Sequence, residues 1–131
     1  MKPQIDADER GLDGITDAII GCAFRVSNVL GCGFLEKVYE NALAMEIRKA
    51  GLGVEQQAAI EVTYDGSLVG EYRADLLVEG DVVVELKAAK SPSAVDLAQC
   101  LNYLKASDRR VCLLLNFGMP KLEIRRVVNN Y

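Results

Sequence analysis

Two apolar strands joined by a short turn are predicted by the stretch YRADLLVEGDVVVELK, which runs from Tyr72 to Lys87. Short runs of apolar, valine-rich residues favour strands, and the glycine between Glu79 and Asp81 favours a turn. The first strand carries Asp75, and the second carries Glu85 and Lys87. A β-hairpin that brings two carboxylates and an ammonium group together can hold a divalent metal ion beside a fixed positive charge. That arrangement suits cleavage of phosphodiesters.

The register across the turn decides whether the two carboxylates meet. With a three-residue turn over 79–81, Val78 pairs with Val82, and counting back places Asp75 opposite Glu85. Facing residues of an antiparallel pair have Cβ atoms about 4.5–5.5 Å apart. A two-residue turn would put the carboxylates on opposite faces of the sheet. The metal-site hypothesis therefore requires the odd turn or an equivalent bulge.

Alternation along the strands predicts which side chains share a face. On the earlier strand Ala74, Leu76 and Val78 should lie on one face, with Asp75 on the other. The same register places Arg73 opposite Lys87. We therefore expect both cationic side chains near the carboxylates.

Two facing carboxylates repel one another, so a proton, a cationic side chain or a metal ion must offset their charge. Lys87 is available for this role. Oxygen ligands suit Mg²⁺ or Mn²⁺ better than Zn²⁺. Lys87 could then orient or deprotonate a metal-bound water, or neutralise the transition state. The alternative is a cross-strand salt-bridge cluster on an exposed face of the sheet.

The composition restricts the remaining chemistry. The chain has 131 residues, of which 50% are hydrophobic and 26% charged, as in one ordinary soluble domain. It contains no histidine, which excludes Ser-His-Asp and Cys-His nucleophiles and histidine-bound zinc. The four cysteines form no C-x-x-C pair, and Cys22, Cys100 and Cys112 lie among apolar residues, so we expect buried thiols rather than a metal cluster.

Charge and hydropathy bear on partners and location. The net charge of −4 argues against strong non-specific binding to nucleic acid. No apolar run approaches the roughly 20 residues needed to span a bilayer, so no membrane association is expected. The start of the chain, residues 1–10, is charged and lacks an apolar signal core. We therefore expect a cytoplasmic protein.

The order of secondary structure is predicted to be α-α-β-β-β-α-β-β. We expect a flexible lead-in over residues 1–12 and a single α/β domain over residues 13–131. The predicted helices span about 13–30, 34–50 and 94–106, and the predicted strands span 54–64, 68–78, 82–88, 111–116 and about 122–128. The helix between the third and fourth strands forms a crossover, so those strands can run parallel in a central mixed sheet.

Local turn signals support these boundaries. Glycines over 31–33 stop the first helix, and Asp65-Gly66 is a strong hairpin signal because both positions tolerate positive φ. Gly70 is expected to mark a bulge. The segment Ser91-Pro92-Ser93 should break the chain and start the third helix.

Two further motifs lie on the predicted helices. Residues 33–39 fit G-x-x-E-x-x-Y and place Glu36 and Tyr39 on one helix face. Residues 99–103 fit Q-x-x-x-Y. With Asp75, Glu85-x-Lys87 and the run Asn116-Phe117-Gly118-x-Pro120, the chain strongly resembles the GxxExxY family of the PD-(D/E)xK nuclease superfamily. The resemblance extends in order and spacing from about residue 15 to residue 128.

The resemblance implies a restriction-endonuclease-like fold and a metal-dependent hydrolysis of phosphodiester bonds in nucleic acid, with DNA as the leading expectation. By position, Asp75, Glu85 and Glu36 would bind Mg²⁺ or Mn²⁺, and Lys87 would be the catalytic lysine. Gln99 and Tyr103 match the extra motif of the RecB-like branch and would orient the active site or the nucleic acid. Tyr39, from the G-x-x-E-x-x-Y motif, is the third candidate for orienting the substrate. Many relatives carry histidine where this chain has Ser27, and another near Asp96.

Other interpretations of the same residues remain open. The fold could be retained without cleavage, in a module that binds nucleic acid or a partner protein, and a homo-oligomeric scaffold with a salt-bridge network is a third interpretation. Glu36 could simply favour the start of its helix, and Tyr39 could be a core residue with a satisfied hydroxyl group. Tyr64 and Tyr72 are expected to be sheet residues without chemistry.

Overall fold

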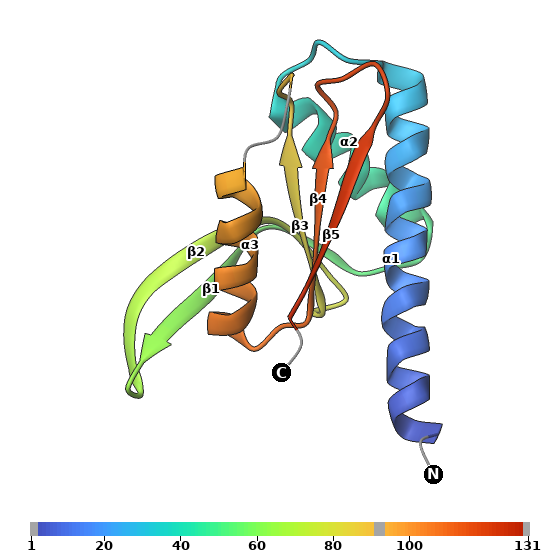
Figure 1. The fold of residues 1–131 in the computed structure, drawn as a ribbon. Helices are drawn as coiled ribbons and strands as arrows, with labels where there is room; N and C mark the ends of the chain where they lie inside the picture. Colours follow the sequence, from blue (N-terminus) through green and yellow to red (C-terminus); the bar gives the residue numbers. More distant parts are fainter. Residues whose placement is uncertain (1–2, 91–93, 130–131) are drawn as a thin grey trace.

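The chain folds into three layers, with a five-stranded sheet between two helices on one face and a third helix on the other (Figure 1). The structure is a computed structural model and describes residues 3–90 and 94–129. Its elements are α1 (Pro3–Leu30), α2 (Glu36–Lys49), β1 (Val54–Tyr64), β2 (Ser67–Val78), β3 (Val82–Lys87), α3 (Ala94–Ser107), β4 (Val111–Asn116) and β5 (Glu123–Val128). The predicted element order and the α/β class are confirmed.

The first helix begins earlier than expected. We predicted that it starts at Asp13 after a flexible lead-in, whereas α1 is helical from Pro3. Proline is well tolerated in the first helical turn because the N–H group that it lacks would have no partner there. The residues before Asp13 are mostly polar and carry no apolar stripe, so periodicity alone gave no sign of a helix there. The predicted break at Ser91-Pro92-Ser93 lies outside the described residues.

The sheet has the predicted mixed topology. Its strand order is β1-β2-β3-β4-β5, in which β3 and β4 are parallel and the other neighbours are antiparallel. Val78 pairs with Val82 across a three-residue turn, as the metal-site hypothesis requires. Glu79 and Gly80 take left-handed φ values of 55° and 70° in this turn. Within the described residues, the β2–β3 ladder ends at the pair Leu76 and Val84.

The tip of the β1–β2 hairpin forms as the sequence predicts. Asp65 and Gly66 have φ values of 52° and 79°, as expected for a two-residue hairpin turn. The register then shifts, because Val62 pairs with Gly70 whereas Thr63 pairs with Leu68. The extra residue makes the bulge expected beside Gly70. Figure 1 shows this hairpin extending to the lower left, away from β3, β4 and β5.

The base of the same hairpin departs from regular alternation. Gln57, inside β1, has a left-handed φ of 54°. Leu76 packs against the α1–α2 side of the sheet, whereas Ala74 packs with Ala58 against the α3 side. Our expectation that Ala74 and Leu76 share a face is therefore wrong. Gln57 has no pair in the β1–β2 ladder. Beyond it, the buried apolar side chains of the hairpin pack towards α3.

Two hydrophobic cores hold the layers together. The larger core joins α1 and α2 to the sheet through residues that include Ile19, Leu43 and Leu113. The smaller core joins α3 to the opposite face and includes Cys100 and Cys112. Cys22 is also buried, whereas Cys32 is exposed, and all four cysteines are free thiols, as expected for three of them. Among the described residues, no helix is long and apolar enough to cross a membrane.

Candidate active site

Asp75 and Glu85 come together where β2 separates from β3. The carboxylate of Asp75 accepts a hydrogen bond from the Leu86 backbone N–H at 2.8 Å, and a longer one of 3.4 Å from the Gln57 side-chain amide. Glu85 is 8% exposed. The Leu86 N–H that bonds Asp75 follows Glu85 directly in the chain, and the negative charge of Asp75 acts on Glu85. The two carboxylates are therefore neighbours, although the backbone ladder ends one residue short of them.

The environment of Glu85 disfavours its negative charge. Burial, followed by the charge of Asp75, raises the pKa of Glu85 to about 8. Positive charge close to Glu85, from a proton or a cation, is therefore favoured. A buried carboxylate beside a half-buried one fits a divalent metal ion.

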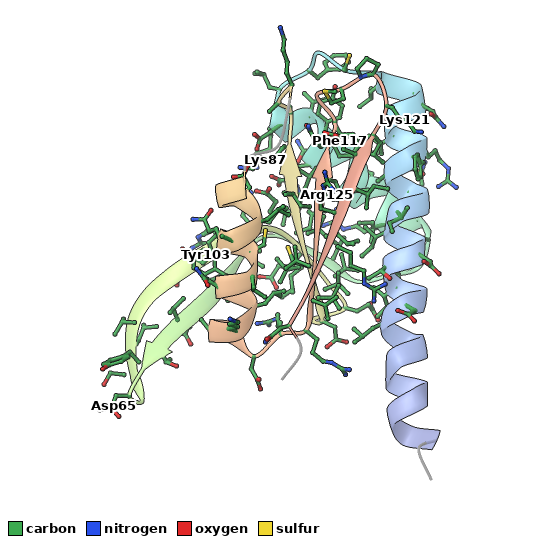
Figure 2. The ribbon with its side chains drawn as sticks, in the orientation of Figure 1. Asp65, Lys87, Tyr103, Phe117, Lys121 and Arg125 are labelled. Carbon is green, nitrogen blue, oxygen red and sulfur yellow. The ribbon has the colours of Figure 1, made fainter. Side chains whose placement is uncertain are left out.

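Tyr72 is a site residue that the sequence analysis missed. Its hydroxyl group donates a hydrogen bond to Glu85, and its ring stacks on Tyr103 with centroids 3.7 Å apart and an interplanar angle of 12°. Tyr103, labelled on α3 in Figure 2, therefore supports the site through Tyr72. Our expectation that Tyr72 has no role beyond the sheet is wrong. Its place three residues before Asp75 on the same strand is the only local signal.

Lys87 lies at the end of β3 and forms an ion pair with Asp96, at an N–O distance of 3.5 Å. Burial lowers the pKa of Lys87, but the nearby carboxylates of Asp96 and Glu36 outweigh it and leave that pKa raised. Lys87 therefore carries a positive charge beside the carboxylates. Arg73 does not lie opposite it as predicted: Arg73 bonds the Gln57 carbonyl oxygen at 3.0 Å, because β2 has left β3 by this point.

Glu36 is the first residue of α2 and is exposed. Partial burial raises its pKa, the charge of Lys87 lowers it, and the charge of Asp75 raises it further. Lys87 and Asp75 therefore lie close enough to Glu36 to shift the pKa of its carboxyl group. The structure brings Glu36 to the same end of the sheet as the predicted cluster.

Glu40, one helical turn beyond Glu36, is a second residue that the sequence analysis missed. It is 4% exposed. Its oxygens accept hydrogen bonds from the Lys37 ammonium group at 3.1 and 3.2 Å, from Gln56 at 2.8 Å and from Gln57 at 2.9 Å. The spacing of four residues from Glu36 is a signal that could have identified it.

Tyr39 is fully buried and cannot touch a substrate directly. Its hydroxyl group donates to the Gly31 carbonyl oxygen at 2.6 Å and accepts from the Phe34 N–H at 3.2 Å. Its ring stacks on Phe117 with centroids 4.7 Å apart. The tyrosine therefore fixes the connection that leads into Glu36.

The run from Asn116 to Pro120 closes the same end of the sheet. The Asn116 side chain accepts hydrogen bonds from the N–H groups of Ala89 and Gly118, at 3.1 and 2.9 Å, and donates to the Ala89 carbonyl oxygen at 2.8 Å. The Phe117 N–H donates to the Lys87 carbonyl oxygen at 2.8 Å. A Cβ atom at Gly118 would overlap the backbone of Ala89. Figure 2 shows Lys87 and Phe117 at this end.

Gln99 is exposed on α3. With Asn102, Tyr103 and Val62 it lines an open depression of about 550 Å³ between α3 and β1. A larger depression of about 620 Å³ lies at the opposite end of β3, around Gly80. In the part of the chain that the structure describes, no three acidic or cysteine side chains are close enough to hold a metal ion together.

Comparison with known proteins places this chain in a family. The model of the PD-(D/E)XK nuclease superfamily matches residues 13–127. The chain therefore belongs to the PD-(D/E)XK nuclease superfamily. No curated protein matches the chain.

Solved structures share the fold. The crystal structure of SSO0001 has a TM-score of 0.57 and 17% identity, over 72% of this chain and 51% of that one. An alkaline exonuclease from Laribacter hongkongensis has a TM-score of 0.51 and 17% identity, over 72% of this chain and 56% of that one. The chain thus spans about half the length of these structures. The likeness confirms the predicted restriction-endonuclease-like architecture.

Proposed function

We propose that the protein is a metal-dependent nuclease that hydrolyses phosphodiester bonds of nucleic acid, with DNA as the expected substrate. The observation that carries this proposal is the position of half-buried Asp75, bonded to the Leu86 N–H, beside buried Glu85, with the Lys87 ammonium group at the end of the same strand as Glu85. Membership of the nuclease superfamily supports it. The chemistry needs both features, because a phosphodiester presents negative charge to any attacking water.

Asp75 and Glu85 would hold Mg²⁺ or Mn²⁺, and Glu36 would add a third negative charge at the same end of the sheet without sharing the ion with both of them in this arrangement. Mg²⁺ keeps several waters and often binds through only one or two carboxylates, so the Asp75–Glu85 pair suffices for such an ion. A bound ion would lower the pKa of a coordinated water and stabilise charge on the phosphate.

The other side chains have supporting roles in this proposal. The charge of Lys87 lies where it can stabilise negative charge on the phosphate, and Asp96 orients its ammonium group. Tyr72 holds Glu85 in place. Gln99 and Tyr103 would orient the nucleic acid along the depression beside α3.

Finer assignments rest on the motifs. We assign the chain to the GxxExxY family and to the RecB-like branch because Glu36, Tyr39, Gln99 and Tyr103 fit those patterns. A cytoplasmic location and assembly into a homo-oligomer belong to the same proposal. Size-exclusion chromatography with light scattering would test the second point.

A matched pair of lysine variants tests the proposal. Calorimetric titration with Mn²⁺ should show binding, and cleavage of single- and double-stranded DNA and RNA should require Mg²⁺ or Mn²⁺. Lys87→Ala should lower the cleavage rate by about 10²–10³-fold because it removes charge stabilisation. Lys105→Ala, on the exposed surface of α3, should cleave like the wild type. Wild-type activity in Lys87→Ala would refute the mechanism.

A second candidate function is binding without cleavage, to nucleic acid or to a partner protein. The observation that favours it is the Tyr72 hydroxyl bond, which already satisfies Glu85 without an ion. This candidate predicts nucleic-acid binding in gel-shift assays with no turnover at any metal concentration. Metal-dependent cleavage that is lost on chelation excludes it.

A further inference from the structure

Gln57 joins two elements of the site through one amide group. Its side-chain nitrogen donates to Glu40 on α2 at 2.9 Å and to Asp75 on β2 at 3.4 Å. An NH₂ group has two hydrogens, so it can serve two acceptors. The two acceptor oxygens therefore lie within about 6 Å of each other, with a donor between them.

The backbone of Gln57 is unusual for its position. The described non-glycine residues with left-handed φ are Gln57, Asp65, Glu79 and Asp108. Of these, Gln57 lies inside a strand, with ladder pairs on both sides of it at Gln56 and Ala58. Left-handed backbone in a residue with a long side chain persists only when the surroundings impose it, and such residues concentrate at functional sites.

The contacts around Gln57 supply that constraint. Its carbonyl oxygen accepts a hydrogen bond from Arg73 at 3.0 Å, and its amide nitrogen is held by buried Glu40. Glu40 is in turn fixed by Lys37 and by Gln56. The amide group of Gln57 is thus aimed at Asp75 from a rigid support.

We propose that Gln57 is a positioning residue, which fixes the Asp75 carboxylate for metal binding and couples it to α2 through Glu40. The effect of Gln57 on catalysis rests on the proposed function. The energetic coupling between Gln57 and Asp75 does not, because it can be measured in the folding equilibrium. A neutral donor suits this place, because a cation here would compete with the metal ion. The amide holds two neighbouring carboxylates without removing the negative charge that a metal ion needs.

Two variants separate positioning from folding. Gln57→Gly removes the amide and suits the left-handed backbone, so the protein should fold with a melting temperature close to that of the wild type. Its half-saturating Mn²⁺ concentration should rise and its kcat should fall, each about tenfold, with KM for nucleic acid unchanged. Gln57→Glu keeps the length but adds a charge beside Asp75, and it should lose more activity than Gln57→Gly.

Gln56→Ala is the matched control, because Gln56 bonds Glu40 but has no bond to Asp75 among the described contacts. In a double-mutant cycle of Gln57→Gly with Asp75→Ala, the folding equilibrium constant of the double variant should differ at least threefold from the value expected if the two changes were additive. The cycle of Gln56→Ala with Asp75→Ala should be additive.

The outcomes distinguish this inference from the proposed function. An additive Gln57 cycle overturns the inference whatever the activity of the protein. Coupling without any change in Mn²⁺ affinity or kcat of Gln57→Gly overturns the positioning role. A wild-type protein that binds Mn²⁺ but cleaves nothing refutes the proposed function, while weaker Mn²⁺ binding by Gln57→Gly still supports the inference. Absence of Mn²⁺ binding by the wild type overturns both.

Discussion

The two ends of the β1–β2 hairpin each contain a left-handed residue, for opposite reasons. At the tip, Asp65 takes φ 52° beside Gly66 in a two-residue turn, and this dipeptide requires that backbone locally. At the base, Gln57 takes φ 54° with no turn around it. There the contacts with Glu40, Asp75 and Arg73 impose the conformation from outside the strand. The left-handed conformation is thus favoured by the local sequence at Asp65 and imposed by tertiary contacts at Gln57.

The surroundings of the two ends differ accordingly. The tip exposes Tyr64 at 75%, Leu68 at 58% and Val69 at 60%, so little of it contributes to a core. The base packs against α2 and α3 and carries Asp75. Substitutions at the base should therefore change function or stability strongly, and matched substitutions at the tip should not.

The largest difference is expected between two aspartates of this hairpin. Asp75→Ala should lower metal-dependent cleavage by about 10³-fold, because it removes a proposed metal ligand. Asp65→Ala should leave cleavage intact, since the turn lies outside the site. Single-turnover cleavage rates at saturating Mg²⁺ measure both. Equal rates for the two variants would contradict the assignment of Asp75.

Two glycine substitutions should differ in their effect on stability, because one position is crowded by a distant segment and the other is constrained only by its own turn. Gly118→Ala forces a Cβ atom into the backbone of Ala89, at an expected cost of about 3 kcal/mol. Gly66→Ala meets no atom within 4 Å and only strains the turn, at about 1 kcal/mol. Urea unfolding gives both values. If Gly118→Ala is the milder change, the end of β3 is less constrained than the Asn116 contacts indicate.

The smallest effect is expected from a pair of tyrosines. Tyr72→Phe removes the hydrogen bond to buried Glu85 and should cost about 1–2 kcal/mol of unfolding free energy in metal-free buffer. Tyr64→Phe, at the exposed tip, should have no measurable effect. Thermal melts with EDTA provide the measurement. An unchanged melt for Tyr72→Phe would show that Glu85 does not depend on this donor.

Local signals explain what could be predicted from the sequence. The three-residue turn at Gly80, the Asp65-Gly66 turn and the parallel β3–β4 pair follow from turn chemistry and from the crossover helix, so their register was predictable. The approach of Asp75 to Glu85 followed from that register. The positions of Glu36 and Lys87 at one end of the sheet agree with the motifs.

The missed features all depend on contacts between distant segments. Glutamine has no local preference for left-handed backbone, so Gln57 gave no signal, and neither did the change of sheet face between Ala74 and Leu76 on the strand beside it. Glu40 is a site residue because two glutamines of β1 reach it. The place of Tyr72 three residues before Asp75 is a weak local signal, and its role becomes clear from its contact with Glu85.

The stack of Tyr39 on Phe117 has a consequence for how the protein reaches its native state. The two rings are separated by roughly 80 residues of chain, and closing so long a loop carries a large entropic cost that is repaid only when much of the sheet exists. Because this stack secures both the start of α2 and the end of β3, the proposed catalytic geometry depends on a contact between segments far apart in the sequence. Refolding should therefore restore secondary structure before it restores the site.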